Sequence, residues 1–507
     1  MQGFTSFSGL FTQYQDTRQI NKYENYALWT IPSAFPDNFN FSNKYNADVE
    51  HDYQSIGAML VNSLATKLAE LLFPVNQSFF RIEFTEEMQK KLMSMKGFDQ
   101  KLAEKELIDI ERKACRGLFR NAAYAQLVQM LRYLIITGNA LVHRSDNSLT
   151  VYSPRNFVLL RDNRGSVLDI VVKESIAKGS LPLDVQQLPC LLNKKEFDDV
   201  CVYTRIKREY VGKKSRTKWV VSQQIEDIPI GKVSTYPERL CPYVPVGWNL
   251  INGDSYCRGH VEDHAGDFAK MSDLSRALAL YQLDACKVVN LVKPGAVVDI
   301  DKLEEAVTGE WCQADPDAVK KHEGGEYQKM VALANEISVI YQRLSAAFMH
   351  QGNMRDAERV TATEIQFNAA EADKALGGVY SQLAEWIHLP LAYLLSHEVE
   401  PKLIAAFANS EVQMQVLTGI AALGRTADVD ALIKATNVLN AIIQPLKQVS
   451  QRFDTELIVD RVMQSYGLNP EDWMLDEKAM AEQAAAAEQA IAAADPLQNQ
   501  QAIQGVI

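Results

Sequence analysis

The chain has 507 residues, 47% of them hydrophobic, so it can bury a large core and is long enough for more than one domain. Its 52 Lys and Arg against 64 Asp and Glu give a formal net charge of −12, which argues against a protein that clamps duplex DNA over a broad basic face. Seven widely spaced cysteines without a C-x-x-C pair indicate reduced thiols in a cytosolic setting.

The N-terminus and the most apolar segment argue against secretion and membrane insertion. The opening MQGFTSFSGLFTQYQ has neither a basic stretch nor a continuous apolar stretch, so it predicts no secretion signal. Segment 127–142 is interrupted by Arg132 and Asn139 and is too short to cross a bilayer. We therefore expect no membrane partner.

The first part of the chain reads mainly as helix. An aromatic-rich helix is expected over about residues 10–30, because Pro32 and Pro36 prevent its continuation. Apolar residues at every fourth position predict a second helix over 56–72. The run SFFRIEF then indicates a strand, charged helices follow, and a mostly apolar helix ends near Gly138.

From Ala140 to about Gln224 the pattern changes to short runs rich in β-branched and aromatic residues, which favour strands. The runs are LTVYS, FVLLRD, SVLDIVVKE, VCVYTRIKRE and TKWVVS. The segment RDNRGS supplies a hairpin turn, in which Gly165 can take a positive φ. Because helices flank these runs, the sequence predicts an α+β domain within a mainly α chain.

Two long helical patterns follow, separated by a compact insert. Apolar residues over 261–288 keep helical spacing with no proline before Pro294, which predicts a helix of about 30 residues and roughly 45 Å. A second helix is expected to end at Phe348. The insert has β-like flanks and a short helix, in which Asp301 and Glu304 are spaced as a capping box. Such an out-and-back finger has too little core to be stable alone, so it needs neighbours.

The segment after the second long helix interrupts a strong helical pattern. Gly352 and Asn353 can adopt the left-handed conformation that ends helices. Thr361 and Glu364 form a capping-box pair that would restart a helix. Further on, EVQMQVL alternates like a strand, and the remainder reads as helical with an Ala/Glu/Gln-rich tail.

The same interruption contains Arg355 and Arg359 in an otherwise acidic chain. One interpretation is an ordinary exposed loop whose arginines pair with Asp356 and Glu358. The other is a loop that projects toward a polyanion and binds phosphate groups. The local sequence alone favours the first.

No catalytic motif emerges. In HVEDH, His260 and His264 are four apart, but the position directly after the first histidine is Val261 instead of the glutamate of a zinc-protease motif. Glu262 is displaced around the helix, so we expect a partly solvated helix start and no metal. The chain contains no phosphate-binding glycine loop and no nucleophile elbow. We predict no enzyme activity and no cofactor.

Several long segments are specific enough to compare with known families. They include ERVTATEIQFNAAEADKALGGVYSQLAEWIHLPLAYLL, YALWTIPSAFP, YQSIGAMLVNSLATKLAELLFPVNQSFFRIEF, TGNALV, CPYVPV and GDSYCRGHVEDHAGD. Taken in chain order, they closely resemble the head-to-tail connector, or portal, proteins of short-tailed, podovirus-type bacteriophages. The resemblance covers about residues 26–395, and beyond residue 410 only the helical, Ala- and Gln-rich character matches.

The resemblance implies a portal fold that assembles as a ring, usually of twelve copies, at one capsid vertex. It also implies a division of the chain into an arm, a wing, a stem, a clip, a channel loop and a crown. The expected ranges are arm 1–25, wing 26–258 and 361–410, stem helices 259–290 and 327–349, clip 291–326, channel loop 350–360 and crown 411–507.

The resemblance further implies partners and site residues. Duplex DNA would pass non-specifically through the channel, and His350, Asn353, Arg355 and Arg359 would lie on the channel loop. The clip, with Lys293, Asp315, Lys320 and Lys321, would dock the terminase large subunit and later the tail adaptor. Major capsid and scaffolding proteins would be further partners, with assembly in the host cytoplasm and a final place in the virion. The alternative is a scaffold or minor capsid subunit that conducts no DNA; a metallohydrolase that uses the two histidines is remote.

Overall fold

A computed structural model defines the fold of most of the chain up to residue 416. It describes residues 6–35, 52–73, 78–85, 87–88, 91, 100–119, 123–145, 148–211, 216–251, 253–286, 288–295, 299–309, 311, 317, 319–323, 327–350, 379–408 and 412–416. All of them belong to one compact unit, Met1–Gly419, and a second unit comprises Ile420–Ile507. The helices expected beyond residue 417 therefore lie outside the described residues.

The N-terminal segment forms two helices, so the prediction of one helix over 10–30 is wrong. Helix α1 (Phe7–Tyr14) is followed by α2 (Thr17–Trp29) and the short 3-10 helix η1 (Pro32–Ala34). Asp16 has extended backbone, and its carboxylate accepts hydrogen bonds from the backbone N–H groups of the first turn of α2. This N-cap starts a new helix, because a capping residue must itself be non-helical.

Helices and a two-stranded ribbon form the main core. The helices are α3 (Ile56–Leu72), α5 (Gln100–Leu118), α6 (Ala123–Thr137), α13 (Val379–Leu383), α14 (Leu389–Val399) and α15 (Leu403–Ala408). The expected helix over 56–72 is confirmed, and its leucines at 60, 64, 68 and 72 are fully buried. Both predicted strands, β1 (Phe80–Phe84) and β12 (Val412–Val416), are also confirmed, and they pair with each other in antiparallel register.

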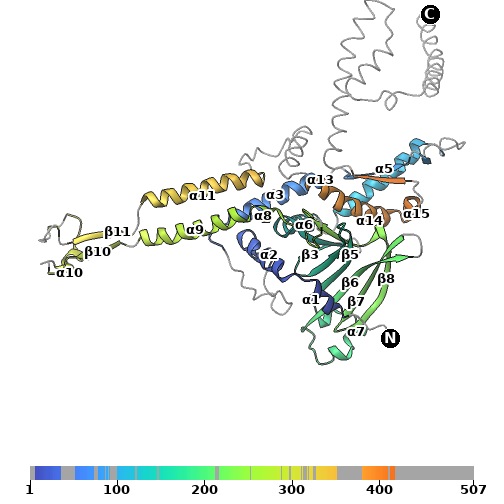
Figure 1. Ribbon diagram of the computed structural model, residues 1–507, viewed down its shortest axis with the longest axis horizontal. Helices are drawn as coiled ribbons and strands as arrows, with labels where there is room; N and C mark the ends of the chain where they lie inside the picture. Colours follow the sequence, from blue (N-terminus) through green and yellow to red (C-terminus); the bar gives the residue numbers. More distant parts are fainter. Residues whose placement is uncertain are drawn as a thin grey trace, which may run out of the picture. The chain divides into compact units, whose positions relative to one another are not determined.

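Two antiparallel sheets lie beside these helices (Figure 1). One has the strand order β4 (Phe157–Arg161), β5 (Val167–Ala177), β6 (Asp199–Val211), β7 (Arg216–Ile225) and β8 (Ile228–Pro237). The other has the order β3 (Ser148–Tyr152), β2 (Asn139–Ser145) and β9 (Tyr243–Gly247). Between β5 and β6 the chain forms η2 (Lys178–Ser180), α7 (Leu183–Gln186) and η3 (Pro189–Leu191), and η4 (Glu238–Leu240) follows β8.

All five predicted β runs are confirmed as strands, and Gly165 takes a φ of 83° in the expected hairpin turn. Strands β8 and β9 were not predicted. None of the side chains of β8 is buried, so the strand lacks the apolar alternation by which strands are recognised. It forms because Glu226 and Asp227, with φ of 45° and 67°, make a turn that folds it back onto β7.

A buried asparagine connects the helical core to the smaller sheet. The Asn139 amide donates to the Tyr23 hydroxyl and to the Cys257 carbonyl, and its oxygen accepts from the Cys257 N–H at 2.9 Å. Gly138 has a φ of 78°, and a side chain there would collide with the backbone of Arg258. The loop before the finger is thereby held against the end of α6.

His388 is buried within a π-helical turn, η6 (Ala384–His388), that precedes α14. Pro390 has no N–H to donate, which favours irregular helix at this point. The imidazole lies between the rings of Phe73 and Phe79, with both centroid distances 4.9 Å. Burial lowers the pKa of His388 to about 3, although a hydrogen bond with the backbone of Leu72 opposes the shift. The side chain is therefore neutral at physiological pH.

The buried imidazole predicts a pH-dependent stability. Between pH about 6.5 and 3 the unfolded chain binds a proton at His388 and the folded chain does not, so the free energy of unfolding falls as the pH is lowered through this window. Calorimetry should show a melting temperature that drops less steeply in His388→Gln than in the wild type. Equal slopes in the two proteins would contradict the assignment.

Candidate functional site on the helical finger

Two helices and a hairpin form an elongated finger, defined here as residues 265–347. Helix α9 (Ala265–Ala285) lies beside α11 (Tyr327–Ala347), and strands β10 (Val288–Val292) and β11 (Val319–Glu323) pair at their far end, next to α10 (Ile300–Glu305) (Figure 1). The strands are antiparallel, with Val288 opposite Glu323 and Val292 opposite Val319. Each 21-residue helix is about 31 Å long.

The finger corrects two sequence predictions. The expected helix over 259–290 is shorter, because α8 (His260–Asp263) ends at His264 and a new helix, α9, runs only to Ala285. Val288 lies in strand β10 instead of a helix. β-branched residues favour strands, and β11 provides the hydrogen-bonding partner that a strand needs. The predicted capping box at Asp301 and Glu304 is also wrong: the carboxylate of Asp299 caps α10 by accepting from the N–H of Lys302.

The described side chains of the finger, together with Phe348 directly after it, are buried only near the body. Five apolar residues at this end have no exposed surface, namely Phe268, Met271, Ile340, Leu344 and Phe348. Among the described side chains of α9 beyond residue 271 and of α11 before residue 340, none is buried. Two ion pairs connect the helices, Arg343 with Asp267 at 2.7 Å and Lys270 with Glu336, but exposed pairs contribute little to stability.

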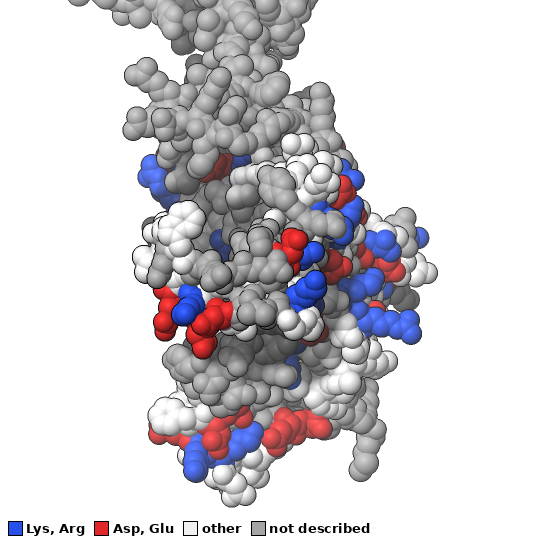
Figure 2. Space-filling model, turned by 90° about the vertical axis from the view of Figure 1, so that its left-hand side faces the viewer, with Lys and Arg blue, Asp and Glu red and all other residues white. Residues whose placement is uncertain are grey.

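Ten large apolar side chains are exposed on the described part of the finger. They are Leu280, Leu283, Leu291, Val292, Ile300, Leu303, Val307, Trp311, Val331 and Val339. Trp311 is 99% exposed, an unusual position for a residue that normally buries most of its surface. Figure 2 shows the side of the molecule at which the finger ends, where the described Lys and Arg side chains are interspersed with Asp and Glu. Because apolar surface gathered on one element is typical of interaction sites, these residues make the finger the candidate interaction surface.

At its base, α11 ends in a Schellman arrangement. The N–H of His350 donates to the carbonyl of Ser345 at 2.7 Å, and the N–H of Met349 donates to that of Ala346 at 3.2 Å. Met349 takes the left-handed conformation, with a φ of 52°. The prediction that Gly352 and Asn353 end the helix is therefore wrong, since α11 ends before them and uses a methionine.

Two side chains from distant parts of the chain bind the end of α11. His260 Nε2 lies 3.1 Å from the carbonyl oxygen of Ala347, and Lys67 Nζ donates to the carbonyl oxygen of Met349. Burial lowers the pKa of His260 to about 4, the hydrogen bond to Ala347 opposes this shift, and His264 adds to it. Sequence reasoning missed Lys67, because nothing in its local pattern points to a residue 282 positions away.

The histidine pair considered as a metal site has another role. The rings of His260 and His264 meet edge to face with centroids 5.0 Å apart. His260 Nε2 is engaged by a carbonyl, so it is not available as a ligand. Within the described residues, no group of three His, Cys, Asp or Glu side chains could hold a metal ion.

The predicted channel-loop residues are only partly placed. His350 is half-buried and takes part in the turn that ends α11. Asn353, Arg355 and Arg359 lie outside the described residues, as do Thr361 and Glu364, so their roles stay predictions.

The predicted docking residues of the tip lie on or beside the hairpin. Lys293 follows β10 and is exposed, and Lys320 is exposed on β11 opposite Leu291. Lys321 pairs with Asn290 in the ladder. Asp315 lies outside the described residues. The hairpin therefore brings three of the four positions to one end of the finger, and their docking role stays a prediction.

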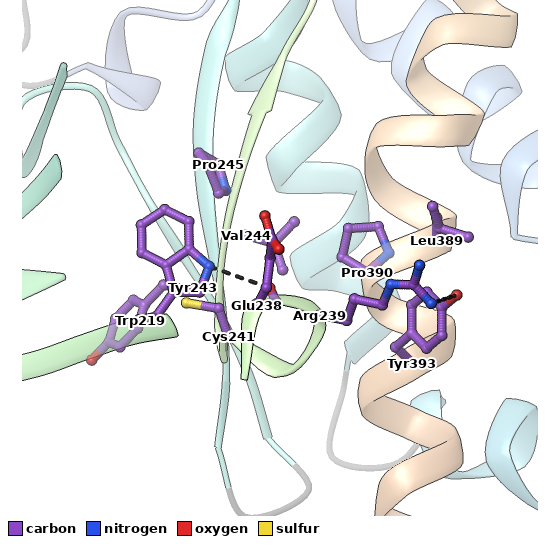
Figure 3. Close-up of a pocket in the computed structure, with 10 residues that line it drawn as sticks. All are labelled: Trp219, Glu238, Arg239, Cys241, Tyr243, Val244, Pro245, Leu389, Pro390 and Tyr393. Carbon is purple, nitrogen blue, oxygen red and sulfur yellow. Dashed lines mark hydrogen bonds between the residues drawn. The ribbon is translucent and has the colours of Figure 1, made fainter. Parts of the chain in front are cut away.

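A cavity of about 290 Å³ lies between β7, β9, η4 and α14 (Figure 3). Trp219, Tyr243 and Tyr393 contribute aromatic walls, and the guanidinium of Arg239 donates to the Tyr393 hydroxyl at 3.1 Å. Burial raises the pKa of the Cys241 thiol in this wall to about 12, so it is no nucleophile at neutral pH. The cavity offers packing surface instead of reactive groups.

Comparison with known proteins identifies the family of the chain. A family model described as "Bacteriophage head to tail connecting protein" matches residues 7–474. The chain belongs to this family. The match is longer than the expected resemblance over 26–395, and it confirms the family that the sequence segments indicated.

Individual relatives of this head-to-tail connecting protein are portal proteins. It is 35% identical over 470 residues to the portal protein of Pseudomonas phage phiKMV, covering 92% of this chain and 91% of the relative. It is 30% identical over 467 residues to the portal protein of Escherichia phage T7, covering 90% and 85%. A chain in the virion of a native gene transfer agent particle is 11% identical with a TM-score of 0.38, covering 91% of this chain and 99% of that chain.

The described part of this head-to-tail connecting protein holds no helix with both the length and the apolar composition that a membrane span requires. Its curated relatives are described as portal proteins. The exposed apolar surface of the finger and the anchored end of α11 are therefore the features that bear on function.

Proposed function

We propose that this chain is a portal subunit whose copies close into a ring, with twelve as the expected number, at one vertex of a phage capsid. The genome passes through the central channel during packaging and ejection. The observation that carries the proposal is the exposed apolar surface of the finger in a member of the head-to-tail connecting family. One copy cannot cover that surface, and identical neighbours can.

Head-to-tail packing explains which residues are exposed. Leu280 and Leu283 are three apart on α9, so they share a helix face, and Val331 and Val339 are eight apart on α11 and also share a face. In a heterologous ring, one surface of each subunit meets a different surface of the next, and rotation closes the assembly. The wing would comprise 26–258 and 361–410, the stem the paired helices, the clip 291–326 and the crown 411–507.

Electrostatics suit a channel that lets DNA slide. A ring whose subunits each have a net charge of −12 does not grip a duplex that has a phosphate about every 1.7 Å of its axis. Arg355 and Arg359, repeated around the ring on the segment that follows α11, would contact phosphates without reading bases. His350 and Asn353 belong to the same proposed channel loop.

The tip of the finger is the proposed docking site for other proteins. Its exposed Trp311 and Val307 offer apolar anchors, and the exposed Lys293 and Lys320 of the hairpin add positive charge. The terminase large subunit would bind here during packaging and the tail adaptor afterwards, while the major capsid and scaffolding proteins would surround the ring. Assembly would take place in the host cytoplasm and leave the ring in the virion.

Removal of apolar contacts from the finger should prevent ring closure. Each buried leucine contributes about 2 kcal/mol to an interface, so Leu280→Ser with Leu283→Ser should shift the protein from rings to monomers. Light scattering and negative-stain images measure this, with Val233→Ser, an exposed residue of β8, as the matched control. Closed rings in the double variant would contradict the proposed packing, and wild-type sheets or shells without an open hole would favour a scaffold or minor capsid subunit.

Loss of the two arginines should weaken the hold on DNA without affecting assembly. Arg355→Ala with Arg359→Ala removes phosphate contacts that are made in every subunit. We expect normal rings and filled heads that lose their genome severalfold faster, measured as nuclease-sensitive DNA over time. Arg164→Ala, in an exposed hairpin turn, is the control. Equal DNA retention in the double variant and the control would remove this role.

Reversal of charge on the hairpin should weaken docking. Lys320→Glu with Lys321→Glu reverses two charges at the tip of every subunit. We expect the terminase large subunit to bind about tenfold more weakly, which corresponds to about 1.4 kcal/mol. Pull-down with purified rings measures it, with Lys232→Glu on the edge strand β8 as the control. Wild-type binding by the hairpin variant would show that this surface does not dock the motor.

A further inference from the structure

The last carbonyl groups of α11 are all occupied, although helix ends normally leave four without partners. Three of them accept hydrogen bonds from backbone N–H groups of the following turn. These pairs are Phe348 with Leu344, His350 with Ser345 and Met349 with Ala346. Among the groups of the described residues, the fourth carbonyl, that of Ala347, is bound by a side chain from another element, the imidazole of His260. The end of α11 therefore depends on α8 for one of its four hydrogen bonds.

The chemistry of this contact defines the state of His260. A carbonyl oxygen only accepts hydrogen bonds, so Nε2 must have the proton and act as the donor. The ring is 7% exposed and packs against Phe348 and Trp248, with centroid distances of 4.6 and 5.6 Å. These rings enclose the donor, and a carbonyl left unpaired at this part-buried position would cost free energy.

A second element holds the same turn. Lys67, on the exposed side of α3, donates to the carbonyl of Met349. Met349 has a φ of 52°, a conformation that non-glycine residues seldom adopt unless their surroundings impose it. The side chain of Phe348, between these two contacts, has no exposed surface. Two helices of the body therefore fix a turn that would otherwise relax.

We propose that His260 is a positioning residue that fixes the end of α11 to the body, with Lys67 as its second support. This pair of hydrogen bonds holds the final turn of α11, up to His350, against α8 and α3. The finger is consequently anchored to the body at this turn. Only the consequence for DNA retention rests on the proposed portal function; the anchor itself does not.

Hydrogen exchange tests the anchor directly, because the N–H groups of Met349 and His350 are the donors of the final turn. In His260→Phe the ring remains and the donor is lost, so these amides should exchange about tenfold faster in the full-length protein. In His260→Gln the side-chain amide can donate from nearly the same place, so slow exchange should return. His264→Phe keeps an aromatic ring near Phe348 and should leave the rates unchanged.

A packing role alone would predict a different pattern, with Phe tolerated and Gln harmful. Unchanged exchange in His260→Phe would overturn the proposal. If that variant does not fold, Lys67→Met provides the same test from an exposed position, and wild-type exchange at Met349 and His350 would again overturn it.

DNA retention in filled heads separates the anchor from the proposed function. Faster exchange together with faster genome loss in His260→Phe supports both. Faster exchange with normal retention, while the arginine double variant still leaks, overturns the link between the anchor and the DNA contact. Normal retention in both variants counts against the channel loop and leaves the anchor supported by its exchange rates.

Discussion

The thinness of the finger is the constraint on which the rest of the structure depends. In two helices of 21 residues and a two-stranded hairpin, the described side chains are fully buried only where the finger joins the body. A helix pair or a single hairpin gains too little burial to be stable alone in water. Exposed side chains such as Leu280 and Trp311 are the consequence, and neighbouring copies of the chain are the cover that we propose for them.

The body meets this constraint by offering a rigid attachment. Its core is formed by apolar helices around α3, and its few buried polar groups, such as Asn139 and His388, have defined positions in the packing. At the base of the finger, His260 and Lys67 satisfy carbonyls that a free helix end would leave to water. The strained backbone of Met349 persists there because both contacts hold it.

The same features explain why a conduit is a better proposal than a catalyst. The cavity beside α14 has aromatic walls and a Cys241 thiol whose pKa burial raises to about 12. The histidine pair that resembled a metal motif is engaged in packing and in a backbone contact. What the chain displays to the outside is apolar surface on the finger, mixed charge at its tip and a net charge of −12.

Hydrophobic periodicity and specific sequence segments predicted the helix over 56–72, five strands of the sheets, the out-and-back finger and the family. Each of these depends on residues that are close in sequence. Local sequence patterns gave wrong predictions near Asp16, Val288 and Asp299. Asp16 and Asp299 are N-caps that start helices, and Val288 lies in a strand because β11 pairs with it. Strand β8 and the contact of Lys67 with Met349 could only be found in the fold. Pairing between residues far apart in the chain leaves no local pattern, so tertiary structure alone determined where strands meet and how α11 ends.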